Sequence, residues 1–223
     1  MKEEYTRETY PSFGKKYNSE RGIISLTSWR ARINTVSKTL FSLLKQCPGF
    51  HIVLVLSEEE FPKMMDELPD NLKLFVDNGL IEILWVYKNY KSFKKWIFTA
   101  DKYRDVPIIS ADDGCIYIRN YAEELFQNWL SNKNKIISIK KFKRTDCVIG
   151  GSGYGMLFPP FCKLVQFSSH LTSNIIETND DDYWFGFLCK REKINILFLN
   201  SKITFKNLPE CFANSLEKMR LHK

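Results

Sequence analysis

The sequence predicts an α/β fold: one domain with a mostly parallel central sheet flanked by helices. Between residues 22 and 112, short apolar runs alternate with segments of helical periodicity, a rhythm typical of right-handed βαβ crossovers. The apolar runs, such as Ile52–Leu56, contain no alternating polar residues, which indicates strands covered on both faces. After residue 113 the rhythm becomes irregular, so we expect a less regular second half within the same domain.

The first half is expected to contain four strands with helical segments between them. Apolar residues recur every three or four positions through 36–46, and Pro48 and Gly49 end that helix. Segment 92–103 is amphipathic in the same way. The expected strands are 22–27, 52–56, 81–86 and the run that ends at Asp112, and the expected helical segments are 36–46, 61–68, 72–78 and 92–103.

The second half combines helices, short strands and a glycine-rich loop. Residues 147–155 are rich in glycine, and the short apolar run 156–158 is followed by Pro159 and Pro160. Residues 1–21 are polar without a clear period, and we expect an N-terminal arm there, followed by a single domain over 22–223. The remaining expected elements are helices 121–131, 182–190 and 209–221 and strands 135–139 and 194–199.

The composition is that of an ordered globular protein. Of 223 residues, 44% are hydrophobic and 14% aromatic, which is enough to bury a core and excludes a disordered chain. The formal net charge of +7 favours anionic partners such as nucleotide phosphates. The aromatic residues do not interleave with basic residues in a nucleic-acid-binding pattern, so no nucleic acid is expected.

The cysteines and the apolar segments bear on location. The six cysteines are scattered without a C-x-x-C pair, which argues against a zinc site and for reduced thiols. No signal peptide and no run long enough to span a bilayer is visible, so we expect a cytoplasmic protein. Peripheral association with an anionic membrane surface stays open because of the positive charge. No pattern predicts an oligomeric state.

The segment VPIISADDGCIY (106–117) contains the strongest functional signal. Its apolar run ends in Asp112 and Asp113, followed by Gly114. Ligands bind at the carboxyl ends of strands in open α/β sheets, and paired carboxylates are costly to bury without a positive partner. A divalent metal that carries a phosphorylated substrate is one such partner. Solvated acids at an ordinary strand exit are the alternative.

Several segments, in this order and spacing, resemble a bacterial and viral family of small glycosyltransferases with a GT-A fold. The resemblance covers residues 22–199. The matching segments are SLTSWRAR (25–32), LVLSEEE (54–60), YKSFKKWI (90–97), ISADDGCIY (109–117), GGSGYGMLFPP (150–160) and DDDYWF (180–185).

This resemblance implies a Rossmann-related sheet and a glycosyltransferase that uses a nucleotide-diphospho-sugar donor. The acceptor is expected to be a hydroxyl of a glycan or of a lipid-linked glycan, in polysaccharide or glycan assembly. The resemblance also implies Mn²⁺ or Mg²⁺, a Lewis acid for the departing diphosphate, with Asp112 and Asp113 as oxygen ligands. Asp112 is in addition expected to contact the donor.

The resemblance further implies donor-binding roles for five residues. Thr27, Trp29 and Arg32 follow the first strand, where Trp29 is suited to stacking on a base and Arg32 to pairing with phosphate. Lys94 is expected near the diphosphate, and Gly151 belongs to a loop whose backbone approaches the sugar closely. Core packing of Trp29, a solvated Lys94 and a purely structural hairpin at Gly151 are the alternatives.

Acids at a predicted helix start supply the candidate catalytic base. By resemblance, Asp181 is the first choice for deprotonating the acceptor hydroxyl and Asp182 the second. Helix capping is a sufficient alternative explanation for acids at this position.

Gly114 departs from the family pattern, which has a third acid in that place and usually uses the last acid as a metal ligand. Three alternatives follow: Asp113 takes over as the metal ligand, the donor binds without metal, or the chain is inactive. A non-catalytic relative that binds a glycan or a nucleotide sugar is the alternative function.

Overall fold

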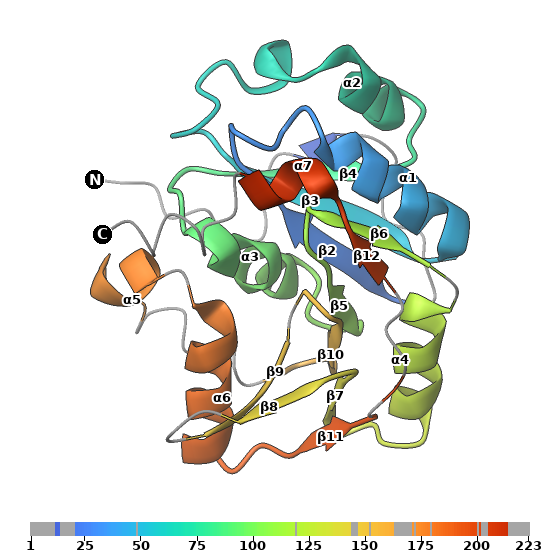
Figure 1. Cartoon of the computed structure of the whole chain (residues 1–223), viewed down its shortest axis with the longest axis vertical. Coiled ribbons are helices and arrows are strands. Elements are labelled where there is room, and N and C mark those ends of the chain that lie inside the picture. The colour runs from blue at the N-terminus through green and yellow to red at the C-terminus, as the bar shows by residue number, and fades with distance from the viewer. Residues whose placement is uncertain are drawn as a thin grey trace.

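In the computed structural model, a central sheet of eight strands lies within the described residues, which are 12–13, 21–47, 49–118, 120–143, 147–151, 153–162, 171, 173–178, 180–199, 201 and 205–213 (Figure 1). In spatial order the strands are β1 (Ser12–Phe13), β4 (Glu82–Val86), β3 (His51–Ser57), β2 (Ile23–Thr27), β5 (Ile108–Ser110), β10 (Met156–Phe158), β7 (Ile136–Ser138) and β11 (Ile196–Phe198).

The predicted mostly parallel sheet is confirmed. Strands β4, β3, β2 and β5 are parallel neighbours, and β11 is parallel to β7, whereas β10 is antiparallel to both β5 and β7. The chain runs outward from β2 to β3 and β4, then returns to place β5 on the other side of β2. The strand order therefore reverses between β2 and β5, and this topological switch point is where open α/β sheets bind ligands.

Helices cover both faces of the sheet. Helices α1 (Val36–Gln46), α2 (Asp70–Asp77) and α4 (Tyr121–Leu130) pack on one face, while α3 (Lys94–Lys102) and α6 (Asp181–Arg191) pack on the other. Successive residues of a strand point to opposite faces, so every second residue of β3 joins each cluster. This two-sided burial explains the uninterrupted apolar runs of the sequence.

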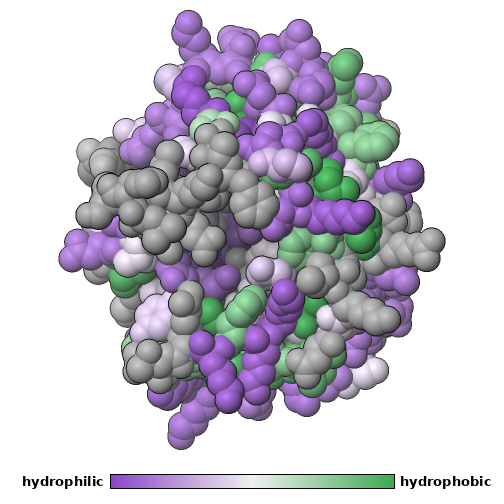
Figure 2. Space-filling model, in the orientation of Figure 1, coloured by the Kyte–Doolittle hydropathy of each residue, from purple (hydrophilic) through white to green (hydrophobic). Residues whose placement is uncertain are grey.

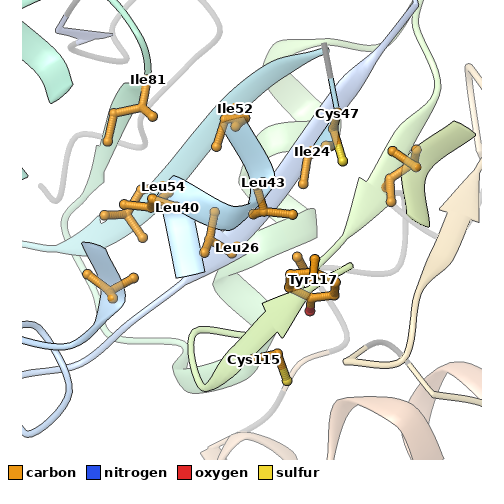
Figure 3. Packing of buried hydrophobic residues seen from close by; sticks show 14 of the residues in the cluster. Ile24, Leu26, Leu40, Leu43, Cys47, Ile52, Leu54, Ile81, Cys115 and Tyr117 are labelled. Carbon is orange, nitrogen blue, oxygen red and sulfur yellow. The ribbon is translucent and has the colours of Figure 1, made fainter. Parts of the chain in front are cut away.

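The packing of α1 shows how the periodicity of the sequence becomes a core. Figure 3 shows Leu40 and Leu43 of α1 lying over Leu26 of β2 and Leu54 of β3. All four side chains are fully buried. Each contributes about 1.5–3 kcal/mol to stability through the removal of apolar surface from water.

Two small sheets and several short elements complete the fold. Strand β6 (Cys115–Tyr117) pairs with β12 (Phe205–Asn207), and β8 (Lys141–Lys143) pairs with β9 (Val148–Gly150). The pairing of β6 with β12 joins segments far apart in the sequence, which is why periodicity did not predict it. The short helical elements are η1 (Met64–Glu67), η2 (Lys91–Phe93), α5 (Ser173–Thr178) and α7 (Pro209–Ala213).

The predicted elements agree with the structure within a few residues, with local exceptions. The helical segment expected over 61–68 is the single 3-10 turn η1. The C-terminal helix expected over 209–221 is seen as α7 up to Ala213, and the rest lies outside the described residues. Most of the expected arm over 1–21 also lies outside them, but Ser12–Phe13 pair antiparallel with β4 at the sheet edge.

The cysteines, the helices and the surface add three observations. All six cysteines, each within the described residues, are free thiols. In the part of the chain that the structure describes, no helix has the length and apolar character needed to cross a membrane. Figure 2 shows hydrophilic residues over most of one face, interrupted by small groups of apolar residues.

Candidate active site

The candidate site lies at the switch point, where the carboxyl ends of β2 and β5 meet. Ser28, directly after β2, donates from its hydroxyl to Oδ2 of Asp113, which follows β5, at 2.7 Å. The backbone amide of Ala111 donates to the carbonyl of Ser25 at 2.9 Å and extends the β2–β5 pairing to this edge. The two loops that sequence analysis selected are therefore in direct contact.

Asp113 is a buried carboxylate with both oxygens engaged. Arg32 donates from Nη1 to Oδ1 at 2.7 Å, opposite the Ser28 contact on Oδ2. The hydroxyl of Thr39 in α1 also holds the Asp113 carbonyl at 2.9 Å. Burial raises the pKa of Asp113 above its ordinary value, and the Arg32 charge and the Ser28 hydrogen bond oppose that rise. Asp113 thus joins the loop after β2 to the turn after β5, which is called the acidic turn below.

Lys95 of α3 joins the two groups of acids that the sequence analysis treated separately. Its Nζ lies 2.8 Å from Oδ1 of Asp112 and 3.3 Å from Oδ2 of Asp181, and its side chain is 3% exposed. Burial alone lowers the pKa of a lysine, but the charges of Asp112, Asp181 and Asp182 outweigh burial and raise the pKa of Lys95 above its ordinary value. Lys95 is therefore a buried, fully charged ammonium group.

The start of α6 brings the candidate base to this lysine. Asp180 caps the helix, because its Oδ1 accepts from the backbone amide of Tyr183 at 3.1 Å. Asp181 is buried and directed toward Lys95, whereas Asp182 is more exposed. Capping thus accounts for Asp180 alone, and the structure brings Asp181 to the strand-end acid Asp112.

The glycine-rich loop packs against the acidic turn through Gly153. A Cβ atom at Gly153 would overlap the carboxylate of Asp112, so any other residue there requires that carboxylate to move. The buried Tyr117 hydroxyl accepts from the backbone amide of Asp112 at 2.7 Å and donates to the carbonyl of Gly153 at 3.1 Å. Gly151, the predicted donor contact, instead packs beside the rings of Phe142 and Tyr154.

Gly114 has a packing explanation. A Cβ atom at this position would lie 3.1 Å from Cβ of Cys211 in α7 and 3.3 Å from Nη1 of Arg32. Arg32 also donates to the carbonyl of Cys211 at 3.2 Å. A third acid would therefore require the Arg32 guanidinium and Cys211 of α7 to shift by a few tenths of an ångström.

Three further predicted donor residues lie near this edge of the sheet: Thr27, Trp29 and Lys94. Thr27 donates from its hydroxyl to the carbonyl of Val55 at 2.7 Å, which links β2 to β3. Trp29 is half-buried, and its indole nitrogen has no hydrogen-bond partner among the described residues. Lys94 is buried. Its Nζ lies 2.8 Å from both Oε2 of Glu60 and Oδ1 of Asn89, and these two contacts join the loop after β3 to the loop after β4.

Sequence reasoning selected Lys94, whereas Lys95 is the lysine that contacts the candidate acids. Helical spacing places Lys95 and Thr99 on the same side of α3, but only the structure shows that this side faces β2. Thr99 is buried 2.8 Å from the hydroxyl of Ser25 in β2, so the residue one turn earlier reaches the end of the sheet.

The acids do not fit a divalent metal ion in this arrangement. Asp113 has both oxygens engaged by Arg32 and Ser28, and Asp112 and Asp181 share the ammonium group of Lys95. Across the described residues, no group of three or more His, Cys, Asp or Glu side chains is placed to hold a metal. Cationic side chains therefore occupy the positions that the predicted metal ligands, Asp112 and Asp113, would offer to Mn²⁺ or Mg²⁺.

Comparisons with known proteins yield structural likeness only. No family model and no curated protein matches the sequence. The fold is matched by 175 chains of solved structures. One of them is a crystal structure of GalNAc-T7 with UDP, GalNAc and Mn²⁺, with 16% sequence identity and a TM-score of 0.43. That match covers 54% of this chain and 22% of the GalNAc-T7 chain.

Proposed function

We propose that this chain is a glycosyltransferase that transfers a sugar from a nucleotide-diphospho-sugar to an acceptor hydroxyl. One observation carries the proposal: Lys95 holds Asp112, at the end of β5, and Asp181, at the start of α6, within 2.8 and 3.3 Å of one ammonium group. Two acids from distant segments thus lie together at the switch point, where open α/β sheets bind nucleotides.

The cationic side chains of the site suit a diphosphate leaving group. A departing nucleoside diphosphate gains negative charge, and fixed positive groups at that place lower the barrier to transfer. Arg32 and Lys95 lie at this edge, 16% and 3% exposed, and their carboxylate partners hold both in one orientation. Trp29 and Thr27, at the end of β2, are the proposed contacts of the nucleoside.

Asp181 is the proposed general base. A carboxylate that accepts the proton of the acceptor hydroxyl lets that oxygen attack the sugar carbon as the bond to the diphosphate breaks, with inversion at that carbon. Lys95 fixes Asp181 relative to Asp112, so the acceptor side and the donor side are held in one geometry. The acceptor proposed is a hydroxyl of a glycan or a lipid-linked glycan.

A thermal-shift panel tests the proposal. UDP-, GDP-, CMP- and dTDP-sugars are each added to the protein in Mn²⁺ and in EDTA. A ligand at 100 times its Kd stabilises the folded state by about 2.7 kcal/mol, so one donor class is expected to raise Tm by several degrees. As a control for nonspecific binding of the anionic donors to lysines, the variant Lys141→Gln removes a lysine on β8. It is expected to respond to the donors as the wild type does. No response to any donor would overturn the proposal.

Binding without turnover is the second candidate function, and Gly114 favours it. The family pattern has a third acid at this position, whereas here Gly114 lies close to Arg32 and Cys211. Donor binding together with no release of nucleoside diphosphate over a broad screen of acceptors would select this alternative.

A further inference from the structure

Lys95 stands where a metal-dependent site would need a cation. Its Nζ lies between the carboxylate after β5 and the carboxylate at the start of α6, at 2.8 Å from Asp112 and 3.3 Å from Asp181. Asp182 adds a third negative charge nearby. The α3 backbone that carries Lys95 is itself fixed, because Ser25 of β2 donates from its hydroxyl to the Lys95 carbonyl.

Resting on the proposed function, we infer that Lys95 is the resident cation of this site and that the donor diphosphate is bound without a divalent metal ion. An ammonium group and a divalent ion compete for the same carboxylate oxygens. Lys95 reaches these oxygens from inside the protein, with 3% of its side chain exposed, so a metal ion that took its place would leave a buried ammonium group without its partners.

Asp113, the second predicted metal ligand, also has both carboxylate oxygens engaged by protein side chains. Both oxygens of Asp113 are held at 2.7 Å by Arg32 and Ser28, and the carboxylate is 8% exposed. The neighbouring position, Gly114, offers no oxygen from a side chain and is packed against Arg32 and Cys211. Both oxygens of Asp113 and Oδ1 of Asp112 are thus engaged by protein side chains, while the Asp112 side chain is 46% exposed.

The contacts of Lys95 predict that a variant without its ammonium group gains a metal site. The carboxylates of Asp112 and Asp181 both contact the Lys95 ammonium group, and Asp182 adds a negative charge nearby. Removal of that ammonium group in Lys95→Gln leaves the Asp112 and Asp181 oxygens open to Mn²⁺, which prefers oxygen ligands. The variant is therefore expected to acquire a metal site that the wild type lacks, a result that a merely structural role of Lys95 does not produce.

The test uses thermal unfolding and direct Mn²⁺ titration of the full chain. For the wild type, Mn²⁺ alone is expected to leave Tm within one degree of its value in EDTA, and whichever of UDP, GDP or dTDP binds is expected to do so equally in both. For Lys95→Gln, Mn²⁺ alone is expected to raise Tm by several degrees. Lys95→Arg, which keeps the charge, is expected to behave as the wild type does. Adding Asp112→Asn to Lys95→Gln is expected to remove the Mn²⁺ response.

The outcomes separate this inference from the proposed function. Nucleoside diphosphate binding to the wild type that requires Mn²⁺ would overturn the inference and leave the proposed function standing. The same inference is overturned if Lys95→Gln folds and shows no Mn²⁺ response. Should Lys95→Gln fail to fold, the wild-type titration decides alone. No binding of any nucleoside diphosphate would overturn the proposed function and the metal-free binding that rests on it, whereas a Mn²⁺ response confined to Lys95→Gln would still support Lys95 as the resident cation.

Discussion

Lys94 and Lys95 are adjacent in α3, yet their ammonium groups bind different carboxylates. Neighbouring side chains on a helix point about 100° apart, so the two lysines face different sides of the β2 end. Lys94 reaches Glu60 and Asn89, and burial lowers its pKa more than the charge of Glu60 raises it. Lys95 reaches Asp112 and Asp181. One lysine therefore supports loops, and the other joins the proposed reacting groups.

Replacement of the candidate base is the sharpest test at the scale of one residue. Asp181→Asn keeps the size of the side chain and removes its basicity. It is expected to slow transfer by about 10²–10⁴-fold and to leave donor binding within a few-fold, since general base catalysis contributes that much. Release of nucleoside diphosphate, measured with the donor that the panel identifies, checks the rate. Asp182→Asn is the matched control, and a larger loss there would move the base to Asp182.

The close approach of Gly153 to Asp112 gives a second residue-scale prediction. In Gly153→Ala the new methyl group overlaps the Asp112 carboxylate, which must then move away from Lys95. Donor affinity is expected to fall at least 10-fold, because charge-assisted contacts depend on this geometry. Gly151→Ala is the control, since its methyl group meets the rings of Tyr154 and Phe142 instead. Equal effects of the two variants on donor Kd would contradict the assigned role of Gly153.

At the scale of elements, a salt bridge joins the loop after β2 to the turn after β5. Arg32 binds Asp113 and also the carbonyl of Cys211, so the same guanidinium connects this turn to α7. The two strand ends and α7 are thus held by one side chain, and the position of the acidic turn depends on it.

Removal of Arg32 is expected to cost stability. In Arg32→Met, the buried Asp113 carboxylate loses its cation, which lowers the free energy of unfolding by about 3–5 kcal/mol. Urea denaturation measures the change. The double variant with Asp113→Asn is expected to be more stable than Arg32→Met, because the uncompensated charge is gone. A double variant less stable than Arg32→Met would show that the ion pair is not the cause.

Another buried acid, Glu82, lies at the opposite end of the sheet and predicts the pH dependence of stability. Glu82 of β4 accepts from His51 at 3.0 Å, from Lys102 at 2.8 Å and from Tyr103 at 2.5 Å. Burial alone raises its pKa, but these partners outweigh burial and hold the pKa of Glu82 below the ordinary 4.5. The folded state thus favours the ionised form.

The sign of the pH effect follows. Stability from Glu82 is fully present above its unfolded pKa and is lost as pH falls through the lower folded value. Glu82→Gln is expected to unfold with a free energy about 1–3 kcal/mol lower at pH 7, and to lose less further stability below pH 4.5 than the wild type. Urea titrations at pH 7 and at pH 3.5 measure both. Parallel pH curves for the two proteins would contradict this role.

At the scale of the whole molecule, the sequence predicted what depends on periodicity and missed what depends on long-range contacts. The buried strands β2 to β5 and helix α1 were predicted because apolar patterning reports burial directly. The contacts of Lys95 with the candidate acids and of Gly153 with Asp112 could not be predicted from the sequence, since each depends on which neighbour another segment supplies. The packing of Gly114 against Cys211 joins residues nearly 100 positions apart, and no local pattern encodes it.

The central claim is that one site is assembled from four separate segments, and hydrogen exchange with and without the bound nucleotide sugar tests it most directly. The claim predicts slower exchange in residues 27–32, 92–99, 110–115 and 180–185 together, with Arg32, Lys95, Asp112 and Asp181 among them. Bound donor that leaves these four segments unchanged and protects others, such as α2 and α4, would contradict it.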